Sequence, residues 1–257
     1  MLNYQKMDTF DAKLAMTTMS AMYRKGSVSA PISGKMKLAD LIDLDYRLLR
    51  ILSRLEINLG FGEASISQVC QRSGVDEKTF ILLCKAYTDS NFRPSASELK
   101  DADAHILLKY LKRSHKYYVE TALVALQKSL EKLLECCSEP SGKVIRKFYT
   151  DYKNELVRHF DFEEQSVFPY VEALCSGAVP SGSSTFLDDE HNDIDEKIND
   201  LKNIVMKYLP ENVQNGRIME TLSFLFLLRE DLQSHTAVED NILVPMIKIL
   251  EDSYGRK

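Results

Sequence analysis

The sequence predicts an all-α protein in which a four-helix bundle follows a small helical domain. Glycine and proline are scarce, at 10 and 7 of 257 residues, so the turn density of a many-stranded sandwich or barrel is missing. Four long segments in the C-terminal part each carry a helical apolar stripe. Four of the five histidines recur at matched spacings along those segments. Together these observations favour an up-down-up-down bundle with a polar site inside it.

The composition favours a cytoplasmic protein. Apolar runs are far shorter than a membrane span needs, and residues 1–24 lack the apolar core of a signal peptide. The five cysteines are odd in number and form no C-x-x-C pair, which is typical of reduced thiols. Residues 1–100 hold 14 Lys and Arg against 11 Asp and Glu, and the remainder holds 19 against 27. Because the C-terminal part is acidic and the N-terminal excess small, we expect neither a membrane nor a nucleic-acid partner.

The first hundred residues divide into two parts. Residues 1–36 are expected to form an N-terminal extension that ends in a linker of small residues. Residues 37–95 are expected to form a small helical domain, with helices over 38–52, 65–70 and 76–87. A turn at 73–76 separates the last two, and its final residue, Asp76, is a typical N-cap.

Residues 96–257 are expected to form the bundle. Helical apolar stripes run over 99–135, 143–174, 187–208 and 217–250, and breaks containing Pro, Gly or Ser separate them. Connections this short place consecutive helices side by side and antiparallel.

Four histidines follow one rule of spacing. His115 and His159 are 44 residues apart, as are His191 and His235, and 32 residues separate the two pairs. The midpoints between consecutive histidines, 137, 175 and 213, fall at or within one residue of a predicted break. Because residues equidistant from a turn lie at the same height in an antiparallel pair, each helix should present one histidine at one level of the bundle. His105 does not follow the rule and is interpreted as structural.

Two of these histidines are followed by a carboxylate on the same helix face. His159 with Glu163, and His235 with Glu239, both read H-x-x-x-E. Four residues turn a helix by about 400°, so each pair lies one turn apart on one face. A single buried histidine is usually a hydrogen-bonded core residue, and a single such pair is common on solvated faces. The complete set favours a metal site, because burying two ionised glutamates without a counter-charge costs several kcal/mol each.

The donor types predict a dinuclear centre. Four imidazoles and two carboxylates without a thiolate disfavour a closed structural zinc site, and six ligands exceed what one tetrahedral ion takes. Two carboxylates able to bridge, flanked by two histidines per ion, suit two iron ions. About four protein ligands per ion leave room for a bridging oxo or hydroxo group and one open position for a small molecule. Manganese and zinc stay open as alternatives.

The bundle resembles the hemerythrin-like HHE cation-binding domain. The resemblance rests on Ser114-His115, His159-Phe160-Asp161-Phe162-Glu163-Glu164 with Phe168-Pro169, Glu190-His191, and His235-Thr236-Ala237-Val238-Glu239-Asp240-Asn241-Ile242-Leu243. The chain is more similar to iron-sulfur cluster repair di-iron proteins (the RIC family) than to oxygen carriers, because Asp195 stands where carriers have a further histidine on the third helix. Residues 38–70 also resemble the small helical domain of repair proteins, but residues 58–63 replace its Cys-Cys-Gly-Gly motif and contain no cysteine.

This resemblance implies a stress-response protein that helps restore iron-sulfur clusters damaged by nitric oxide or oxidants. The implied terminal ligands are His115, His159, His191 and His235, and the implied bridging ligands are Glu163 and Glu239. The implied partners are damaged or apo iron-sulfur proteins, with O2 or NO as small ligands. Iron donation and the handling of NO or O2 at the open position are alternative mechanisms.

A second hypothesis is a sensor of O2, NO or iron that signals through the N-terminal helical domain. Residues 66–80 have the pattern of two short helices joined by a turn, as in a helix-turn-helix, which would make DNA the partner. That pattern is unspecific, and Arg72, Lys78 and Lys85 are few cations for a phosphate-binding surface. A homodimer is compatible with either hypothesis.

Overall fold

The computed structural model describes residues 32–135, 137–178, 191–209 and 213–255, and in these residues all regular structure is helical apart from one isolated bridge between Lys37 and Ser65. The predicted all-α class is therefore confirmed. The expectations for residues 1–31 and 187–190 lie outside the described residues. No helix in the described part of the chain is both long and apolar enough to cross a bilayer.

The small helical region contains four α-helices, which are α2 (Leu38–Leu44), α3 (Leu49–Arg54), α4 (Ile66–Ser73) and α5 (Glu77–Thr88). The single helix expected over 38–52 is divided, because Asp45 is extended and its side chain accepts a hydrogen bond from the Arg47 amide, which begins a new turn. The turn predicted at 73–76 is present. Gly74 ends α4 at φ 64°, a left-handed conformation that favours glycine. Asp76 caps α5 by accepting a hydrogen bond from the Thr79 amide.

The first bundle helix differs from the prediction of one helix over 99–135. The structure has α6 (Ala96–Asp101) and then α7 (Ala104–Tyr117), with Ala102 extended between them. The break arises at Asp103, whose carboxylate accepts hydrogen bonds from the amides of His105 and Ile106 and so begins a new helix. The apolar pattern runs across this break and does not reveal it.

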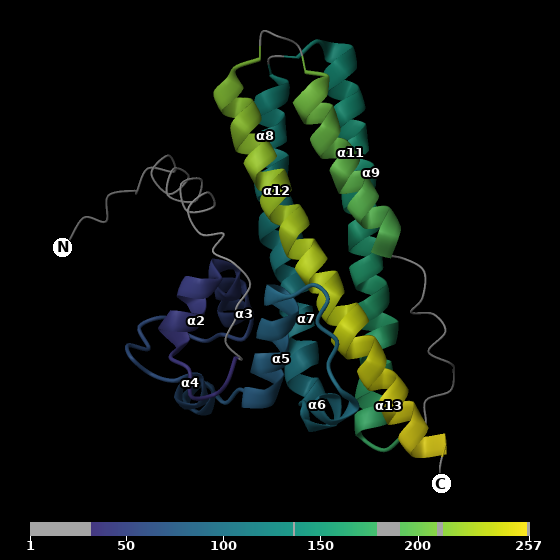
Figure 1. Cartoon of the computed structure of the whole chain (residues 1–257). Helices are drawn as coiled ribbons and strands as arrows, with labels where there is room; N and C mark the ends of the chain where they lie inside the picture. The colour runs from purple at the N-terminus through teal and green to yellow at the C-terminus, as the bar shows by residue number, and fades with distance from the viewer. Residues whose placement is uncertain (1–31, 136, 179–190, 210–212, 256–257) are drawn as a thin grey trace, which may run out of the picture.

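The long helices of the bundle lie side by side (Figure 1). In the described residues the bundle has four long segments, and a π-helical turn interrupts three of them. In chain order they are α7 with η2 (Tyr118–Ala122) and α8 (Leu123–Leu134); α9 (Glu139–Phe162) with η3 (Glu163–Val167) and α10 (Phe168–Cys175); α11 (His191–Lys207); and α12 (Asn215–Val238) with η5 (Glu239–Leu243) and α13 (Val244–Gly255).

The second bundle helix begins one turn earlier than predicted. We expected the second helix to begin at residue 143, but α9 begins at Glu139 and includes Pro140 and Gly142. Proline is tolerated there because the first residues of a helix have no intrahelical acceptor for their amides.

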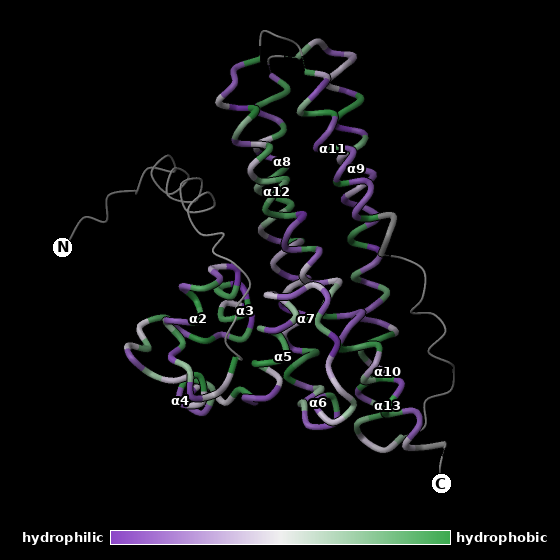
Figure 2. The backbone as a smooth tube through the Cα atoms, in the orientation of Figure 1, coloured by the Kyte–Doolittle hydropathy of each residue, from purple (hydrophilic) through white to green (hydrophobic). Residues whose placement is uncertain are grey.

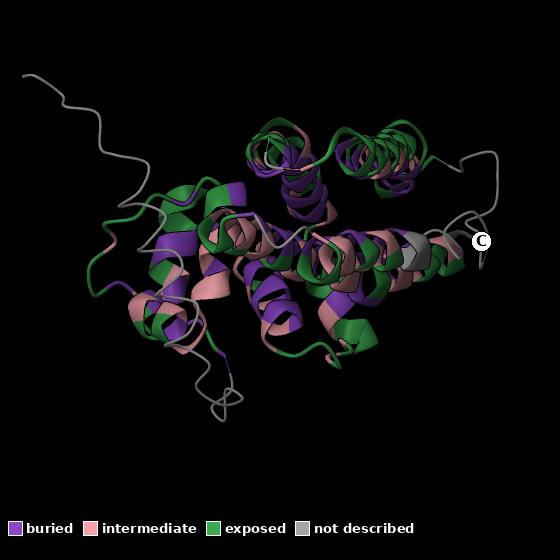
Figure 3. Cartoon of the chain, turned by 90° about the horizontal axis from the view of Figure 1, so that it is seen from above, coloured by how far each residue is buried: buried purple, intermediate pink, exposed green. Residues whose placement is uncertain are grey.

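Two apolar cores fill the molecule. One combines the small helical region with α7, α10 and α13, and the other fills the opposite end of the bundle between α8, α9, α11 and α12. Hydrophobic and hydrophilic residues are mixed along the long helices (Figure 2), and exposed residues lie on the outer faces (Figure 3). Because the small helical region shares a core with the end of the bundle, the division predicted at 95/96 stays a prediction.

Candidate metal centre

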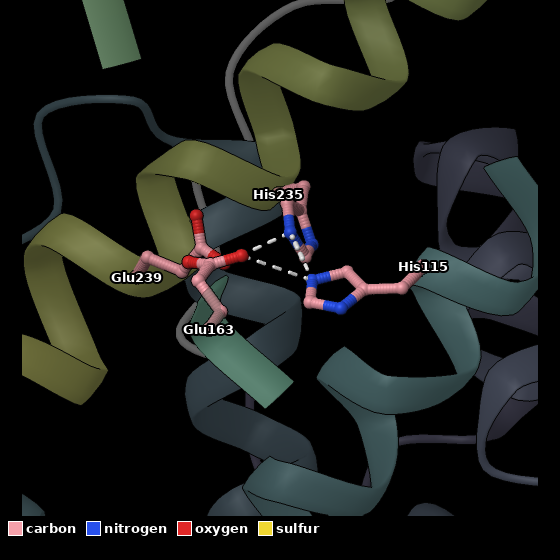
Figure 4. Close-up of side chains that lie close together, drawn as sticks. All are labelled: His115, Glu163, His235 and Glu239. Atoms are coloured by element: carbon pink, nitrogen blue, oxygen red, sulfur yellow. Dashed lines mark hydrogen bonds and ion pairs between the residues drawn. The ribbon is translucent and has the colours of Figure 1, made fainter. Parts of the chain in front are cut away.

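Four buried side chains converge inside the bundle and present metal-binding atoms to one another (Figure 4). His115 comes from α7, His235 from the end of α12, and Glu163 and Glu239 are the first residues of η3 and η5. One donor atom from each lies within 4.8 Å of all the others. The Nε2 atoms of the two histidines are 3.2 Å apart, and the His235 Nε2 lies 2.9 Å from a carboxylate oxygen of Glu239.

The site lies in a polar layer between the two apolar cores. Along α9 and η3, Phe160 belongs to one core and Val167 to the other, with Glu163 between them. Along α7 and η2, His115 similarly lies between Leu111 and Tyr118. Apolar packing on both sides therefore isolates the donors from water, which strengthens their electrostatic interaction with a bound ion.

Each of the three described donor helices changes to a π-helical turn at the site. Glu163 and Glu239 are the first residues of such turns, and η2 begins three residues after His115. A π-helical turn has an i→i+5 hydrogen bond and therefore holds more residues than an α-helical turn. It widens the helix where the carboxylates must reach inward and keeps the flanking segments in register with their neighbours.

A neighbouring carboxylate fixes the orientation of His115. The Nδ1 atom of His115 lies 3.0 Å from an oxygen of Glu164. Because a carboxylate accepts hydrogen bonds, Nδ1 carries the proton and the lone pair of Nε2 faces the other donors. The ring is also stacked between Phe160 and Phe168, at centroid distances of 4.1 and 5.4 Å. These contacts leave the imidazole one orientation.

Burial shapes the proton affinities of the site in the absence of a metal. Burial, together with the charge of Glu239, raises the pKa of Glu163 to about 8. Burial likewise lowers the pKa of His115, although Glu163 opposes that shift. A neutral imidazole is the form that binds a metal, whereas the Glu163 carboxyl holds a proton that a cation would have to displace.

The donor set fits a bound cation. Ligands at about 2.1 Å from an ion and at right angles to each other lie about 3 Å apart. The measured separations are of this size, since Glu163 Oε2 lies 3.3 Å from His115 Nε2 and 3.5 Å from His159 Nε2. That same oxygen is fully buried and makes no well-formed hydrogen bond in the described part of the chain. A cation would satisfy it.

The structure brings four of the six predicted ligands together and places a fifth beside them. His115, Glu163, His235 and Glu239 form the cluster, and His159 is buried beside it at the Glu163 edge. Helix α11 begins at His191, but the side chain of that residue lies outside the described part of the structure. Three of the four histidines thus lie at one level of the bundle. His105 is on the surface, away from the cluster.

A cavity of about 220 Å³ opens beside the cluster, between α9, α11 and α12. Its lining includes His159 and His235 from the site, together with the polar residues Asp195 and Gln233. Asp195 accepts two hydrogen bonds of 3.0 Å from the Arg229 guanidinium and one of 3.2 Å from Gln233. Asp195 therefore forms an ion pair with Arg229 in the lining of this cavity.

Two features of the site were absent from the sequence prediction. Glu164 appears there only as part of a motif, and the partner it orients, His115, is 49 residues away in the chain. The π-helical turns have no clear sequence signal, because five residues are too few to distinguish their period from that of an α-helix.

Comparison with known proteins identifies relatives of the bundle and of the whole chain. Residues 107–247 match the family model of the hemerythrin HHE cation-binding domain. The iron-sulfur cluster repair proteins YtfE of Salmonella paratyphi B and Salmonella newport are each 21% identical over 243 residues, covering 94% of this chain and 96% of the relative. The match to the family model includes every donor of the cluster.

Proposed function

Because the chain belongs to the hemerythrin HHE cation-binding family, we propose that its histidine and glutamate cluster holds two iron ions joined by an oxo or hydroxo bridge. The observation that carries this proposal is the convergence of four buried donors, including two carboxylates, at one point between two apolar cores. Carboxylate bridges in the interior of a helix bundle are typical of dinuclear iron sites.

The six sequence-predicted ligands divide naturally between two ions. Glu163 and Glu239 would bridge, since each belongs to the cluster and has two carboxylate oxygens. His115 and His235 would serve as terminal ligands to one ion, and His159 with His191 to the other. The contact of 3.5 Å between His159 and Glu163 supports a place for the second ion on that side.

The ions would supply a redox-active centre able to bind a diatomic ligand, and the chain supplies access, insulation and orientation. The cavity of about 220 Å³ reaches His159 and His235 and is ample for O2 or NO. Glu164 holds His115 in place, and the aromatic rings of Phe160 and Phe168 keep it from turning.

The metal site is tested by metal content after anaerobic purification. We expect close to two irons per chain, falling to one or none in a variant carrying His159→Ala and Glu163→Ala. His105→Ala is the matched control, because it removes a surface histidine outside the cluster. An iron content unchanged by the double substitution would remove the proposed site.

We further propose that the protein restores iron-sulfur clusters damaged by nitric oxide or oxidants, acting on damaged or apo iron-sulfur proteins in the cytoplasm. The full-length similarity to proteins named for iron-sulfur cluster repair supports this proposal. The test adds the iron-loaded protein to a nitrosylated iron-sulfur enzyme and follows its activity. Recovery must exceed that from an equal amount of free ferrous iron; equal recovery contradicts the proposal.

The sensor hypothesis needs an exposed surface on the N-terminal helices. Helix α5, the second helix of the helix-turn-helix pattern, is largely buried, and Phe80 and Leu83 belong to the shared core. Its lysines are paired, Lys78 with Asp101 and Lys85 with Glu98, each at 2.9 Å. Because paired cations contribute little to phosphate binding, we propose no nucleic-acid partner for this helix.

A further inference from the structure

A buried arginine from the small helical region lies next to the residues that pack against the histidine and glutamate cluster. Arg54 lies at the end of α3 and is only 4% exposed. Its guanidinium donates hydrogen bonds to Asp231 at 2.6 Å and to the hydroxyls of Tyr87 at 2.5 Å and Tyr110 at 3.2 Å. The four residues come from α3, α12, α5 and α7, so one side chain links four helices.

The acceptor of this arginine is close to the site. Asp231 is four residues before His235 on α12, one turn away on the same face, and is 3% exposed. Its main-chain oxygen accepts a hydrogen bond of 3.1 Å from the Tyr118 hydroxyl. The position of the His235 helix is therefore fixed both by Arg54 and by Tyr118.

Tyr118 also lies close to two of the donors. It is the first residue of η2, three residues after His115, and its ring centroid is 5.5 Å from that of His235. The Arg54 guanidinium carbon lies 5.1 Å from the same tyrosine ring. Removing Arg54 would thus disturb, at once, the helices that carry His115 and His235.

The buried ion pair between Arg54 and Asp231 is expected to add little to the stability of the fold. Taking Arg54 and Asp231 out of water costs several kcal/mol, which their attraction rarely exceeds by much. The planar guanidinium fork, in contrast, fixes the directions of its partners and cannot be reproduced by lysine. Polar groups that hold metal ligands in place act in this way.

We propose that Arg54 is a positioning residue of the metal centre, which acts through Asp231 and Tyr118 on His235 and His115. The small helical region is then part of the metal site, and metal binding in turn stabilises the docking of α3, because coupling between two sites is reciprocal. This inference rests on the proposed function, since it requires a metal to bind at the cluster.

The test measures metal affinity and coordination in the full-length chain with Co2+ as the probe. Cobalt affinity is obtained by competition with a chelator, and the d–d absorption bands report the donor geometry. We expect Arg54→Met to weaken Co2+ binding by about 10- to 100-fold and to change the bands. Arg54→Lys keeps the charge without the fork and should lie between the wild type and Arg54→Met.

The matched control is Arg47→Met in the same region. The Arg47 side chain donates its hydrogen bonds to Asp45, two residues earlier in the chain, so its removal should leave Co2+ affinity and the bands unchanged. A folded Arg54→Met chain with wild-type affinity and bands overturns the proposal. If that variant does not fold, Arg54→Met combined with Asp231→Leu removes the buried pair whole and leaves no unpaired charge; wild-type affinity and bands in this double variant overturn the proposal equally.

A measurement on the unmodified chain tests the reciprocal effect. Hydrogen exchange of the backbone amides of residues 49–54 should slow when Co2+ binds, although these residues contribute no ligand. Exchange in α3 that is independent of the metal overturns the coupling. A wild-type chain that binds no Co2+ gives a different result, since it overturns the metal site of the proposed function itself.

Discussion

Glu164 controls the chemistry of a histidine that it reaches across the bundle. Its hydrogen bond of 3.0 Å to His115 Nδ1 leaves Nε2 free of a proton, which is the form that binds a metal. We expect Glu164→Ala to weaken metal binding by about 10- to 100-fold, as losses of such orienting groups do. Glu164→Gln should have a smaller effect because its amide oxygen still accepts a hydrogen bond from the Nδ1–H group of His115.

Metal competition with a chelator provides the measurement for both Glu164 variants. Glu172→Ala is the control, since Glu172 is also an exposed glutamate and pairs with Lys112 on the surface. Equal affinity of Glu164→Ala and the control would show that the hydrogen bond does not matter for binding.

Glu163 gives the metal-free chain a defined response to pH. Its pKa rises from 4.5 to about 8 in the folded state, so the folded chain holds this proton more tightly than the unfolded chain does. The contribution to the free energy of unfolding is complete below about pH 4.5 and is lost as pH rises through about 8. Metal binding near pH 6.5 should therefore release about one proton from this carboxyl.

Calorimetric titration with metal in buffers of different ionisation enthalpy measures that proton release. The number of protons should fall as pH rises above 8, because the carboxyl is then already ionised. Glu163→Gln removes the group and should abolish this pH-dependent part. Proton release that is the same at pH 6.5 and pH 9 contradicts the assignment.

Among the helices, η3 allows one segment both to contribute a side chain to the cluster and to pack in the apolar core. Glu163 must reach the cluster, while Phe168 and Val171 beyond it must stay in the shared core. An extra residue in η3 serves both demands. We expect deletion of the exposed Ser166 to convert η3 to a regular α-helical turn, withdraw Glu163 and reduce metal affinity, with little loss of thermal stability.

Ser166→Ala is the control for this deletion, because it keeps the length of η3. Chelator competition and thermal unfolding of the metal-free chain separate the two expectations. Large losses of both affinity and stability would mean that the extra residue is needed for packing rather than for the placement of Glu163.

The sequence predicted the long helices because their apolar stripes and their breaks are strong signals over many residues. The histidine spacing predicted a common level, and in the described residues His115, His159 and His235 each bring a ring nitrogen close to Glu163. The exact ends of the helices depend on local hydrogen bonds, which the apolar pattern does not show. The Asp103 cap splits α6 from α7, and Pro140 sits inside the first turn of α9 without breaking it.

The small helical region and the bundle share one apolar core. Leu52 and Leu83 of the small region belong to the same core as Leu107 of α7 and Ile247 of α13. The sequence predicted two domains because composition and linkers mark chain segments, whereas the contacts that α3 and α5 make with the bundle join residues far apart in the chain and leave no such mark.

This shared core makes a strong prediction for a chain cut at the expected boundary. A fragment of residues 96–257 would expose Leu107, Tyr110 and their neighbours to water, at a cost of about 1.5–3 kcal/mol for each fully buried apolar side chain. It would also leave Asp231 buried without Arg54, its partner at 2.6 Å. We expect the fragment to unfold at a lower temperature than the full chain and to bind metal more weakly, as measured by thermal unfolding and chelator competition.

The intact chain cleaved between residues 95 and 96 is the control, because both pieces are present and should stay associated through the core. A fragment as stable as the full chain would instead show that the bundle folds as an independent domain and that the shared core contributes little to it.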